Sequence, residues 1–309
     1  MANSQSYSHR KLHSAAPGKA RRFKKEYLWA YLFIAAPIIG FMIFGFIPIC
    51  YSVYISFTQF DGFSSPEFNA LDNYQELFKD PLIRKTALNT CYAALGIPIG
   101  MALSLGIAIA LNQKIAGINF FRTAFFLPAI SSVVALTLLW KWVFNSDFGI
   151  LNQLLGYFGI HGPAWLNEEA WAMPAMIIQG VWGGLGFNMV LYLAALQGVP
   201  SSLYEAAEMD GAGGLQKLRH ITIPGISPTT FFIIVTSIIG ALQDFVRFRI
   251  MTGGGPNFST MTTVYYLFEN AFRYMNMGFA SAMAWGLGIV IMIITLLNFV
   301  LSRRWVHYE

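Results

Sequence analysis

The sequence predicts an all-α integral membrane protein with six transmembrane helices. Composition is the first observation: 56% of the 309 residues are hydrophobic and 11% are charged, whereas about 25% of the residues in soluble globular domains are charged. The second is that the hydrophobic residues gather in long runs, and the third is that lysine and arginine concentrate in alternate connections between those runs. Together they indicate that lipid is the solvent for most of the chain.

Six runs are long and apolar enough to cross a bilayer. The hydrocarbon core is about 30 Å thick and needs about 20 apolar residues in helical form, and charged side chains are rare within it. The predicted spans are Tyr27–Phe57, Thr86–Leu111, Phe121–Phe144, Trp171–Leu196, Thr229–Met251 and Phe279–Leu301. Two further charge-free windows, Phe148–Asn167 and Thr252–Phe268, contain glycine and proline clusters that break helices, so they are not counted as spans.

The basic residues predict the orientation, because cytoplasmic loops retain lysine and arginine. They gather before the first span, between the second and third, between the fourth and fifth, and after the last. We therefore expect both termini in the cytoplasm, and the net charge of +5 needs no nucleic-acid partner. The expected division is a basic cytoplasmic tail (1–26), a first transmembrane helix (27–57), an external loop (58–85), a five-helix core (86–304) with a cytoplasmic loop (200–224), and a cytoplasmic tail (305–309).

The N-terminal tail and the two cysteines carry further expectations. Residues Ser4–Lys25 are polar and basic, which predicts disorder. The apolar run that follows is longer than the core of a secretory signal, about 7–15 residues, so it is expected to remain as an anchor. Cys50 and Cys91 fall in predicted spans, where we expect small buried hydrophobic residues and no disulfide framework.

Motifs for catalysis are missing from the sequence. It contains no G-x-x-x-x-G-K-[ST] phosphate loop, and its histidines are scattered without metal-ligand spacing. The G-x-G pairs at Gly184/Gly186 and Gly286/Gly288 lie inside apolar spans, where close helix packing is the better interpretation. We expect no catalytic residue, no metal and no cofactor on this chain.

One polar, glycine-rich segment, Tyr204–Gly225, interrupts the hydrophobic sequence between the fourth and fifth spans. Ser202 and Glu205 form an S-x-x-E pattern, which predicts a capping box at the start of a helix. Asp210 and Gly211 should end that helix. The pattern is also compatible with an amphipathic connection that lies on the membrane surface.

A second short helix is predicted after Gly213-Gly214 and should end at Pro224. Its apolar face would comprise Leu215, Leu218 and Ile221. The sequence of the segment therefore predicts a helix, a glycine elbow and a second helix.

The spacing within this segment resembles a known motif. The residues are Glu205-Ala206-Ala207, three residues, Gly211, nine residues, Ile221, one residue, Ile223 and Pro224. This closely resembles the EAA motif, E-A-A-x3-G-x9-I-x-L-P, of ABC importer permeases, with Ile223 in place of the usual leucine. The stretches Gln197–Gly213 and Met251–Pro256 look like the carbohydrate branch of that family, which includes maltose-type and multiple-sugar permeases.

The resemblance implies a type I ABC importer permease fold and a set of partners. In that family the motif forms a coupling helix that seats in a groove of an ATPase subunit. Glu205 would face a basic residue of that subunit, Gly211 would permit the bend, and the apolar face would hold the second helix against the membrane domain. The implied coupling residues are Glu205, Ala206, Ala207, Gly211, Ile221 and Pro224.

The family also implies the rest of the transporter. We expect a second homologous permease subunit, two ATPase subunits that bind ATP with magnesium, and an external solute-binding protein that delivers a sugar or oligosaccharide. The chain itself would be a transporter subunit of a bacterial cytoplasmic membrane and not an enzyme.

The predicted fifth span holds an unusual pair of charges, Asp244 and Arg247. One interpretation is an i, i+3 ion pair, and the other is that Asp244 hydrogen-bonds sugar hydroxyl groups, because an ionisable residue in a span is a candidate functional site. Resemblance to the maltose-type permease places sugar contacts at Gly184, Phe187, Ser237, Gly240, Ala241 and Asp244. Asn188 and Gln243 are further polar candidates in the substrate path.

Two other functional classes are the alternatives for such an apolar chain. An ion-coupled secondary transporter would normally show inverted repeats and carboxylates at the membrane midplane, and no such repeat is visible. An intramembrane enzyme would need clustered nucleophiles or metal ligands, which the sequence does not offer.

Overall fold

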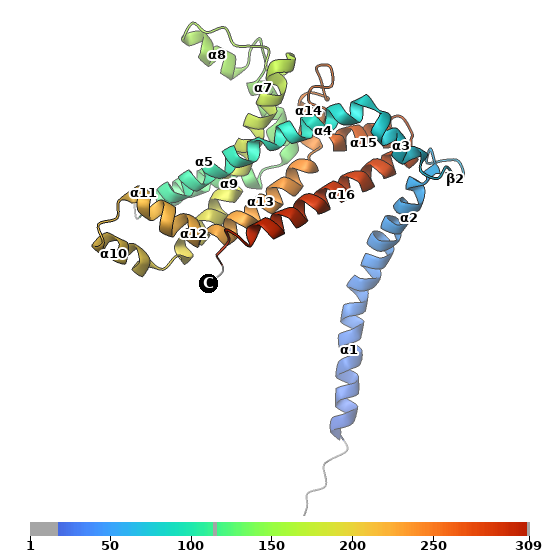
Figure 1. Cartoon of the computed structure of the whole chain (residues 1–309), viewed down its shortest axis with the longest axis horizontal. Coiled ribbons are helices and arrows are strands. Elements are labelled where there is room, and N and C mark those ends of the chain that lie inside the picture. The colour runs from blue at the N-terminus through green and yellow to red at the C-terminus, as the bar shows by residue number, and fades with distance from the viewer. Residues whose placement is uncertain (1–17, 114–115, 308–309) are drawn as a thin grey trace, which may run out of the picture. The chain divides into compact units, whose positions relative to one another are not determined.

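The computed structural model describes residues 18–113 and 116–307 (Figure 1). The chain divides into two compact units, 1–54 and 55–309. Most of the expected basic tail, residues 1–17, lies outside the described residues.

The described part of the first unit, residues 18–54, is a single long helical segment. It comprises α1 (Gly18–Phe41), a π-helical turn η1 (Met42–Phe46) and most of α2 (Ile47–Ser56). The prediction that Ser4–Lys25 is disordered is wrong for residues 18–25, which are helical. Lysine, arginine and alanine are good helix formers, so the helix of the span extends back through them. The candidate span Tyr27–Ser56 has 30 residues, close to the predicted one.

The connection after the first span is small, as expected. Strands β1 (Thr58–Gln59) and β2 (Glu67–Phe68) pair antiparallel, and α3 (Asp72–Lys79) follows. The side chain of Asn73 donates 2.9 Å hydrogen bonds to the carbonyls of Ser56 and Thr58, which anchors α3 to the start of the hairpin.

The second span begins earlier than predicted. Helix α4 (Pro81–Ala94) starts five residues before Thr86, the predicted boundary, and α5 (Gly96–Leu111) continues it. Asp80 caps α4 by accepting a 2.8 Å hydrogen bond from the backbone N–H of Leu82. An aspartate followed by proline is a strong helix-start signal, and hydropathy alone overlooks it because Arg84 and Lys85 lie in the first turns.

The third span is bent. Helices α6 (Ile118–Ile130) and α7 (Val133–Val143) meet at an angle of 101°, so the prediction of a continuous helix over Phe121–Phe144 is wrong. Ser131 has extended backbone between the helices, three residues after Pro128. Hydroxyl side chains compete for backbone hydrogen bonds, and Ser131 Oγ donates to the carbonyl of Leu127.

The remaining elements complete the second unit (Figure 1). They are α8 (Ile150–Tyr157), α9 (Glu169–Gly198), α10 (Ser201–Met209), α11 (Gly214–Lys217), η2 (Leu218–Thr222), α12 (Ile223–Gly225), α13 (Ser227–Leu242), α14 (Val246–Met251), α15 (Thr263–Phe272) and α16 (Met277–Ser302). By length and composition, four helical segments of the described chain could each cross a membrane, or six if two bent pairs each count as one span. Of the two windows rejected as spans, the first contains the short helix α8 and the second only the start of the short helix α15.

The fifth span also departs from its prediction. Helix α13 ends at Leu242, and residues 243–245 separate it from α14. The backbone carbonyl of Asp244 accepts a 3.1 Å hydrogen bond from the Thr262 hydroxyl, the residue that caps α15. A tertiary contact therefore takes the place of a helical hydrogen bond, and a continuous helix over Thr229–Met251 is not formed.

Close packing of α5 against α9 organises the bundle. Gly96 and Gly100 of α5 lie against α9, and Ser104 donates a 3.2 Å hydrogen bond to the carbonyl of Leu185. A Cβ at Gly186 would overlap the backbone of α6, so the helix-packing interpretation is confirmed for this glycine. Gly184 and Gly288 have nothing within 4 Å of that position, and for them it is wrong.

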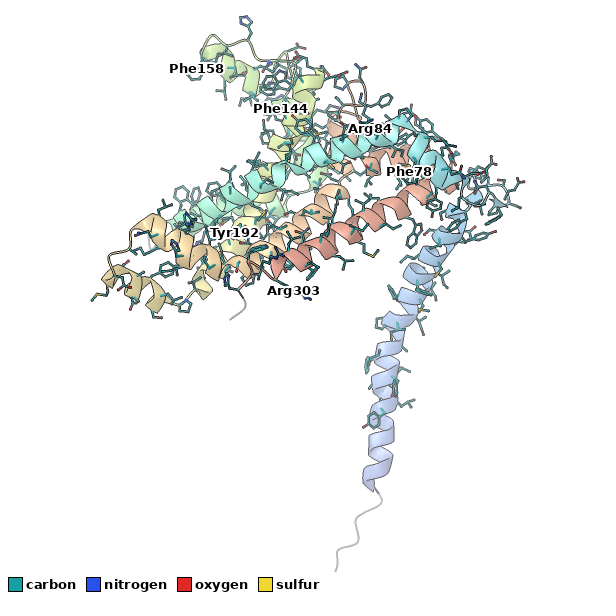
Figure 2. All side chains as sticks on the ribbon, viewed as in Figure 1. Phe78, Arg84, Phe144, Phe158, Tyr192 and Arg303 are labelled. Atoms are coloured by element: carbon teal, nitrogen blue, oxygen red, sulfur yellow. The ribbon has the colours of Figure 1, made fainter. Side chains whose placement is uncertain are left out.

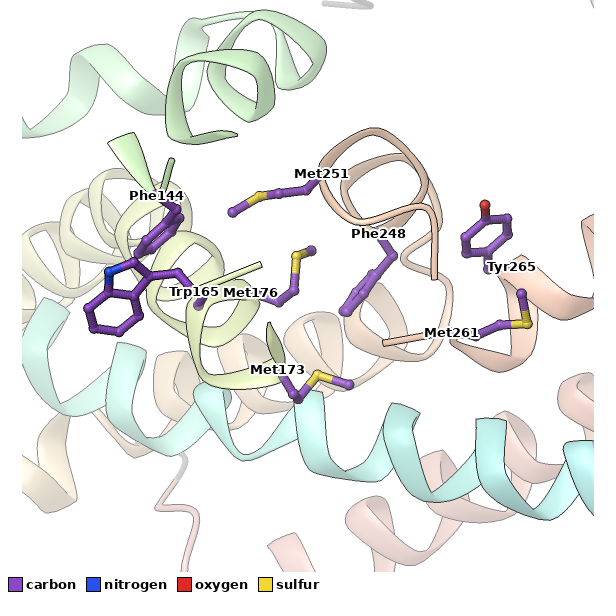
Figure 3. Close-up of a cluster of buried hydrophobic side chains, with 9 residues drawn as sticks. Phe144, Trp165, Met173, Met176, Phe248, Met251, Met261 and Tyr265 are labelled. Carbon is purple, nitrogen blue, oxygen red and sulfur yellow. The ribbon is translucent and has the colours of Figure 1, made fainter. Parts of the chain in front are cut away.

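Two buried hydrophobic clusters stabilise the second unit. One lies between α5, α9 and α13 and includes Tyr192, which Figure 2 labels within the bundle. The other joins α7, α9, α14 and α15 (Figure 3) and comprises Phe144, Trp165, Met173, Ala175, Met176, Phe248, Met251, Met261 and Tyr265. Phe248 is 1% exposed, so this cluster holds α14 in a defined position beside α9.

Many large apolar side chains remain on the surface, as expected for helices solvated by lipid. Cys50 and Cys91 are among the exposed residues, so the prediction that they are buried is wrong. In a membrane, lipid can replace the protein interior as their apolar surrounding.

Candidate functional site

The glycine-rich segment forms a helical hairpin at one end of the bundle (Figure 1). Helix α10 leads into a turn at residues 210–213, and α11, η2 and α12 return as one continuous helical segment. This returning arm ends at Gly225, one residue beyond the predicted proline, and meets α13 at 66°. The hairpin, residues 201–225, is called the coupling loop, after the role that the resemblance implies for it.

The start of the coupling loop differs from the predicted capping box. Pro200 stands at the N-cap of α10 in a non-helical conformation, with no side-chain cap hydrogen bond. A proline disfavours helical geometry in the residue before it, here Val199, so α9 ends at Gly198. Helix α10 then begins directly after Pro200. Ser202 is therefore inside the helix and does not cap it. A cap of this kind is found at the start of the second arm, α11, where Gln216 Oε1 accepts a 2.8 Å hydrogen bond from the N–H of Gly213.

The glycine elbow is confirmed. Gly211 has a φ of +77°, in the left-handed region that favours glycine. Its N–H donates to the carbonyl of Glu208 at 3.0 Å, and the N–H of Ala212 donates to the carbonyl of Ala207 at 2.8 Å. These two bonds form a Schellman motif that terminates α10 and reverses the chain.

Two side-chain contacts join the arms. The hydroxyl groups of Tyr204 and Thr222 share a hydrogen bond of 3.0 Å, and Lys217 Nζ lies 2.7 Å from Glu208 Oε1. The hydrogen bond from Lys217, together with its positive charge, lowers the pKa of Glu208. The coupling loop is therefore held as one structural unit.

The packed face of the second arm is not the predicted one. Leu215 is 78% exposed, whereas Leu218 and Ile221 are half-buried. The π-helical turn η2 changes the residue spacing, so the buried side chains are those of Thr222 and Ile226. The expectation that Leu215 packs against the membrane domain is wrong.

The predicted coupling residues fall in three places. Glu205 and Ala206 are exposed on α10, and Pro224 is half-buried in α12. Ala207, Gly211 and Ile221 line a hollow of about 390 Å³ between the two arms. The hollow is also lined by Asp210, Ala212, Gln216, Lys217 and His220.

A second feature is a cavity of about 190 Å³ between α4, α5, α9, α13 and α14. Of the predicted path residues, Gly184, Asn188, Ser237, Gly240 and Ala241 line it together. The rest of the lining is Ala93, Gly96, Ile97, Gly100, Met176, Ile177, Gly180, Val181, Arg247 and Phe248. Residues from four separate stretches of sequence thus meet in one cavity.

The other predicted path residues lie outside this lining. Phe187 is 53% exposed and Gln243 is also exposed. Asp244 lies in the break after α13 and forms the ion pair that was one of its two interpretations: Arg247 Nε donates to Asp244 Oδ2 at 2.5 Å, and Arg247 Nη2 contacts the same oxygen. The ion-pair interpretation is confirmed.

Arg247, rather than its partner, reaches the cavity. Its Nη1 donates a 2.9 Å hydrogen bond to Gln179 Oε1. A Cβ at Gly180 would overlap Nη1, so the guanidinium occupies space that only glycine leaves open. Sequence reasoning treated Arg247 as a partner of Asp244 and did not identify Gln179 or Gly180, although an arginine in a span was itself a signal.

Within the described residues, no group of three or more histidine, cysteine, aspartate or glutamate side chains could hold a metal ion. The polar side chains of the cavity carry an amide, a hydroxyl and a guanidinium. Such groups bind oxygen-rich molecules through hydrogen bonds.

Known transport proteins resemble the chain over most of its length. The family model described as "Binding-protein-dependent transport system inner membrane component" matches residues 102–307. A probable ABC transporter permease protein, YesP of Bacillus subtilis, is 37% identical over 94% of this chain and 96% of its own length. The diacetylchitobiose uptake system permease protein NgcF of Streptomyces coelicolor is 33% identical over 94% of this chain and 87% of its own.

The fold also matches a solved structure. A chain from the crystal structure of a bacterial alginate ABC transporter in complex with alginate pentasaccharide-bound periplasmic protein superimposes with a TM-score of 0.80. The match has 23% sequence identity and covers 93% of this chain and 97% of the other.

Proposed function

The chain belongs to the family of binding-protein-dependent transport system inner membrane components, and we propose from this that it is the membrane-spanning subunit of an ATP-driven importer for a sugar or oligosaccharide. The observation that carries the proposal is the coupling loop, an exposed hairpin whose arms continue directly into two helices of the cavity. The names of relatives such as NgcF support a carbohydrate as the substrate.

Force applied to the coupling loop would reach the cavity through the backbone. Helix α9 precedes α10 with only Val199 and Pro200 between them, and α13 follows α12 after Ile226. Both α9 and α13 contribute residues to the cavity. A partner that grips the loop and moves would therefore change the spacing of the helices that line the path.

The partners proposed are two ATPase subunits that bind ATP with magnesium, a second homologous permease subunit and an external solute-binding protein. An exposed, polar hairpin on a lipid-solvated protein fits a soluble partner. The alginate transporter complex, which holds a periplasmic protein, supports a binding-protein partner. The chain would bind no cofactor of its own.

The orientation proposed is a multi-pass protein of the bacterial cytoplasmic membrane with both termini in the cytoplasm. Lysine and arginine in the coupling loop and beside both termini support it. This places the coupling loop on the side of the membrane where ATP is available.

Gly184, Asn188 and Ser237 are the proposed substrate-path residues of the cavity, and Phe187, Gln243 and Asp244 are proposed path residues outside its lining. Asn188 and Ser237 supply an amide and a hydroxyl that can exchange hydrogen bonds with sugar hydroxyl groups. Asp244 would act on the path through Arg247, which it binds.

Reconstitution in liposomes tests the proposal. Screening the binding protein against sugars supplies the ligand, and uptake of that ligand is then measured with the chain alone and with the complete complex. We expect uptake only from the complex and only with ATP. Uptake by the chain alone, driven by a proton or sodium gradient, would establish the alternative, an ion-coupled secondary transporter.

A further inference from the structure

The cavity contains one type of charged group. Among the described residues that line it, Arg247 carries the only formal charge, and the remainder are apolar or glycine apart from Asn188 and Ser237. The side chains that line the cavity are mostly small and apolar, so they screen the charge of the arginine only weakly. This charge therefore strongly affects which molecules can enter.

The positive charge of Arg247 is neutralised by an ion pair with Asp244. Asp244 binds the guanidinium through Nε and Nη2, and the side chains of Asp244 and Arg247 are 13% and 22% exposed. Asp244 is itself held by the hydrogen bond between its carbonyl and the Thr262 hydroxyl. The pair therefore presents a guanidinium to the cavity without a net charge.

The guanidinium is fixed in place and keeps unused donors. Arginine has five N–H groups, and the contacts with Asp244 and Gln179 use one on Nε, one on Nη1 and one on Nη2. Among the described residues this leaves one N–H on each terminal nitrogen for a ligand. Gly180 lies against the guanidinium and gives it room beside α9.

We propose that Asp244 and Arg247 form a charge-neutral hydrogen-bond donor that makes the cavity selective for uncharged, polyhydroxylated substrates over acidic ones. The proposal rests on the proposed function and narrows its substrate class. Hydroxyl oxygens accept hydrogen bonds from the two free N–H groups. A carboxylate loses its hydration on entry and finds no net positive charge to compensate it, so Asp244 is a specificity-determining residue that acts through Arg247.

The test compares two probes that share one sugar ring, galacturonate and its methyl ester, on the purified complete transporter. Binding is measured by saturation-transfer NMR, which detects weak ligands. In the wild type we expect preference for the neutral ester. Asp244→Asn retains the shape of the side chain but exposes the charge of Arg247, and should shift the ratio of affinities toward the acid on the order of tenfold, equivalent to about 1.4 kcal/mol.

The double variant Asp244→Asn/Arg247→Gln is the matched control. It removes the exposed charge and should restore the wild-type ratio, which a general loosening of the fold would not do. A ratio that stays the same in Asp244→Asn, or a shift that persists in the double variant, overturns the proposal. Absence of binding by either probe to both the wild type and Asp244→Asn also overturns it, since an exposed guanidinium in an open cavity attracts a carboxylate.

Failure of this inference is distinguishable from failure of the proposed function. The charge shift is a binding measurement and needs no ATP. A shift in Asp244→Asn together with ATP-independent uptake would support the inference and refute the importer, whereas ATP-dependent uptake without the shift would do the reverse.

Discussion

Tyr204 and Thr222 share a 3.0 Å hydrogen bond between their hydroxyl groups that ties the first arm of the coupling loop to the second. Tyr204 lies in α10 and Thr222 at the end of η2. The bond is one of the two side-chain contacts through which movement of the exposed arm can be transferred to the arm that leads into α13.

Removing this bond should weaken coupling more than folding. Tyr204→Phe keeps the ring and loses a hydrogen bond that contributes about 1 kcal/mol. We expect normal membrane abundance, faster hydrogen exchange in residues 201–225, and fewer sugar molecules imported per ATP hydrolysed. Tyr157→Phe is the control, because Tyr157 is highly exposed in α8. Equal exchange rates in the two variants would refute the role of the bond.

Gly211 should be intolerant of substitution because of its backbone. An alanine at a φ of +77° costs about 1 kcal/mol or more, so Gly211→Ala should distort the end of α10 and reduce recovery of the ATPase subunits with the complex. Gly211→Pro should have a larger effect, since proline cannot adopt a positive φ. Gly214→Ala is the matched control: it has open space around its Cβ position and no positive φ. Similar losses in all three variants would show that the elbow is not the cause.

Glu205 should contribute charge to the ATPase contact. It is exposed on α10, and Glu205→Lys would place a positive charge against a basic partner residue. We expect recovery of the ATPase subunits in co-purification to fall about tenfold, equivalent to about 1.4 kcal/mol. Glu67→Lys makes the same reversal at an exposed position in β2 and should leave recovery unchanged. Undiminished ATPase recovery with Glu205→Lys would favour a loop that merely lies on the membrane surface.

The ion pair between Glu208 and Lys217 should make the coupling loop sensitive to acid. The pKa of Glu208 is lowered from 4.5 by Lys217, so the carboxylate contributes stability that is complete above about 4.5 and is lost as the pH falls through the lowered value. Titration of ¹³C-labelled glutamate by NMR should give a midpoint below 4.5 for the Glu208 signal, which is assigned by its disappearance in Glu208→Gln. Lys217→Met should return that midpoint to its ordinary range, and an unchanged midpoint would contradict the pairing.

Hydrophobic runs predicted the long membrane helices well, because the stability of a helix in lipid depends mainly on how many of its residues are apolar. The fourth and sixth spans match α9 and α16 within a few residues. Bends were not predictable in the same way. At the break in the fifth span, the Thr262 hydroxyl donates a tertiary hydrogen bond to the carbonyl of Asp244. At the break in the third span, the Ser131 hydroxyl donates a local hydrogen bond to the carbonyl of Leu127. Neither bond leaves a periodic signal in the sequence.

Local motifs of the coupling loop were predictable only in part. The positive φ at Gly211 follows from residue type, since the helix ends there and glycine tolerates the geometry. The capping role given to Ser202 failed because Pro200 sets the start of α10 one residue after itself. Leu215 was assigned to the packed face by regular helical spacing, which the π-helical turn η2 alters.

The arrangement of residues around the cavity could not be predicted from the sequence, for a different reason. Asn188 was identified as a polar residue in an apolar span and Ser237 by resemblance to the maltose-type permease, and both line the cavity. Gln179 is as polar as Asn188 and lies in the same span, but nothing in the sequence places it or Gly180 beside Arg247. Their relation to Arg247 depends on how α14 packs against α9, which the cluster around Phe248 determines.

Gly180 offers a test of Arg247 that leaves the ion pair chemically intact. A Cβ at this position would overlap Nη1 of Arg247, and the end of a flexible arginine can move aside at modest cost. Gly180→Ala should therefore leave the complex assembled while displacing the guanidinium from Gln179 and from the cavity. We expect uptake per assembled complex to fall, with little change in ATP hydrolysis in the absence of the binding protein.

The control on the same helix is Gly183→Ala, which has nothing within 4 Å of its Cβ position and should transport normally. Arg247→Ala alone removes the donor, and adding Gly180→Ala to it should cause no further loss, because the alanine then has no guanidinium to displace. Coupled effects of this kind are expected for residues in contact, whereas independent sites give additive losses. Additive losses in the double variant would show that Gly180 acts on α9 packing and not through Arg247.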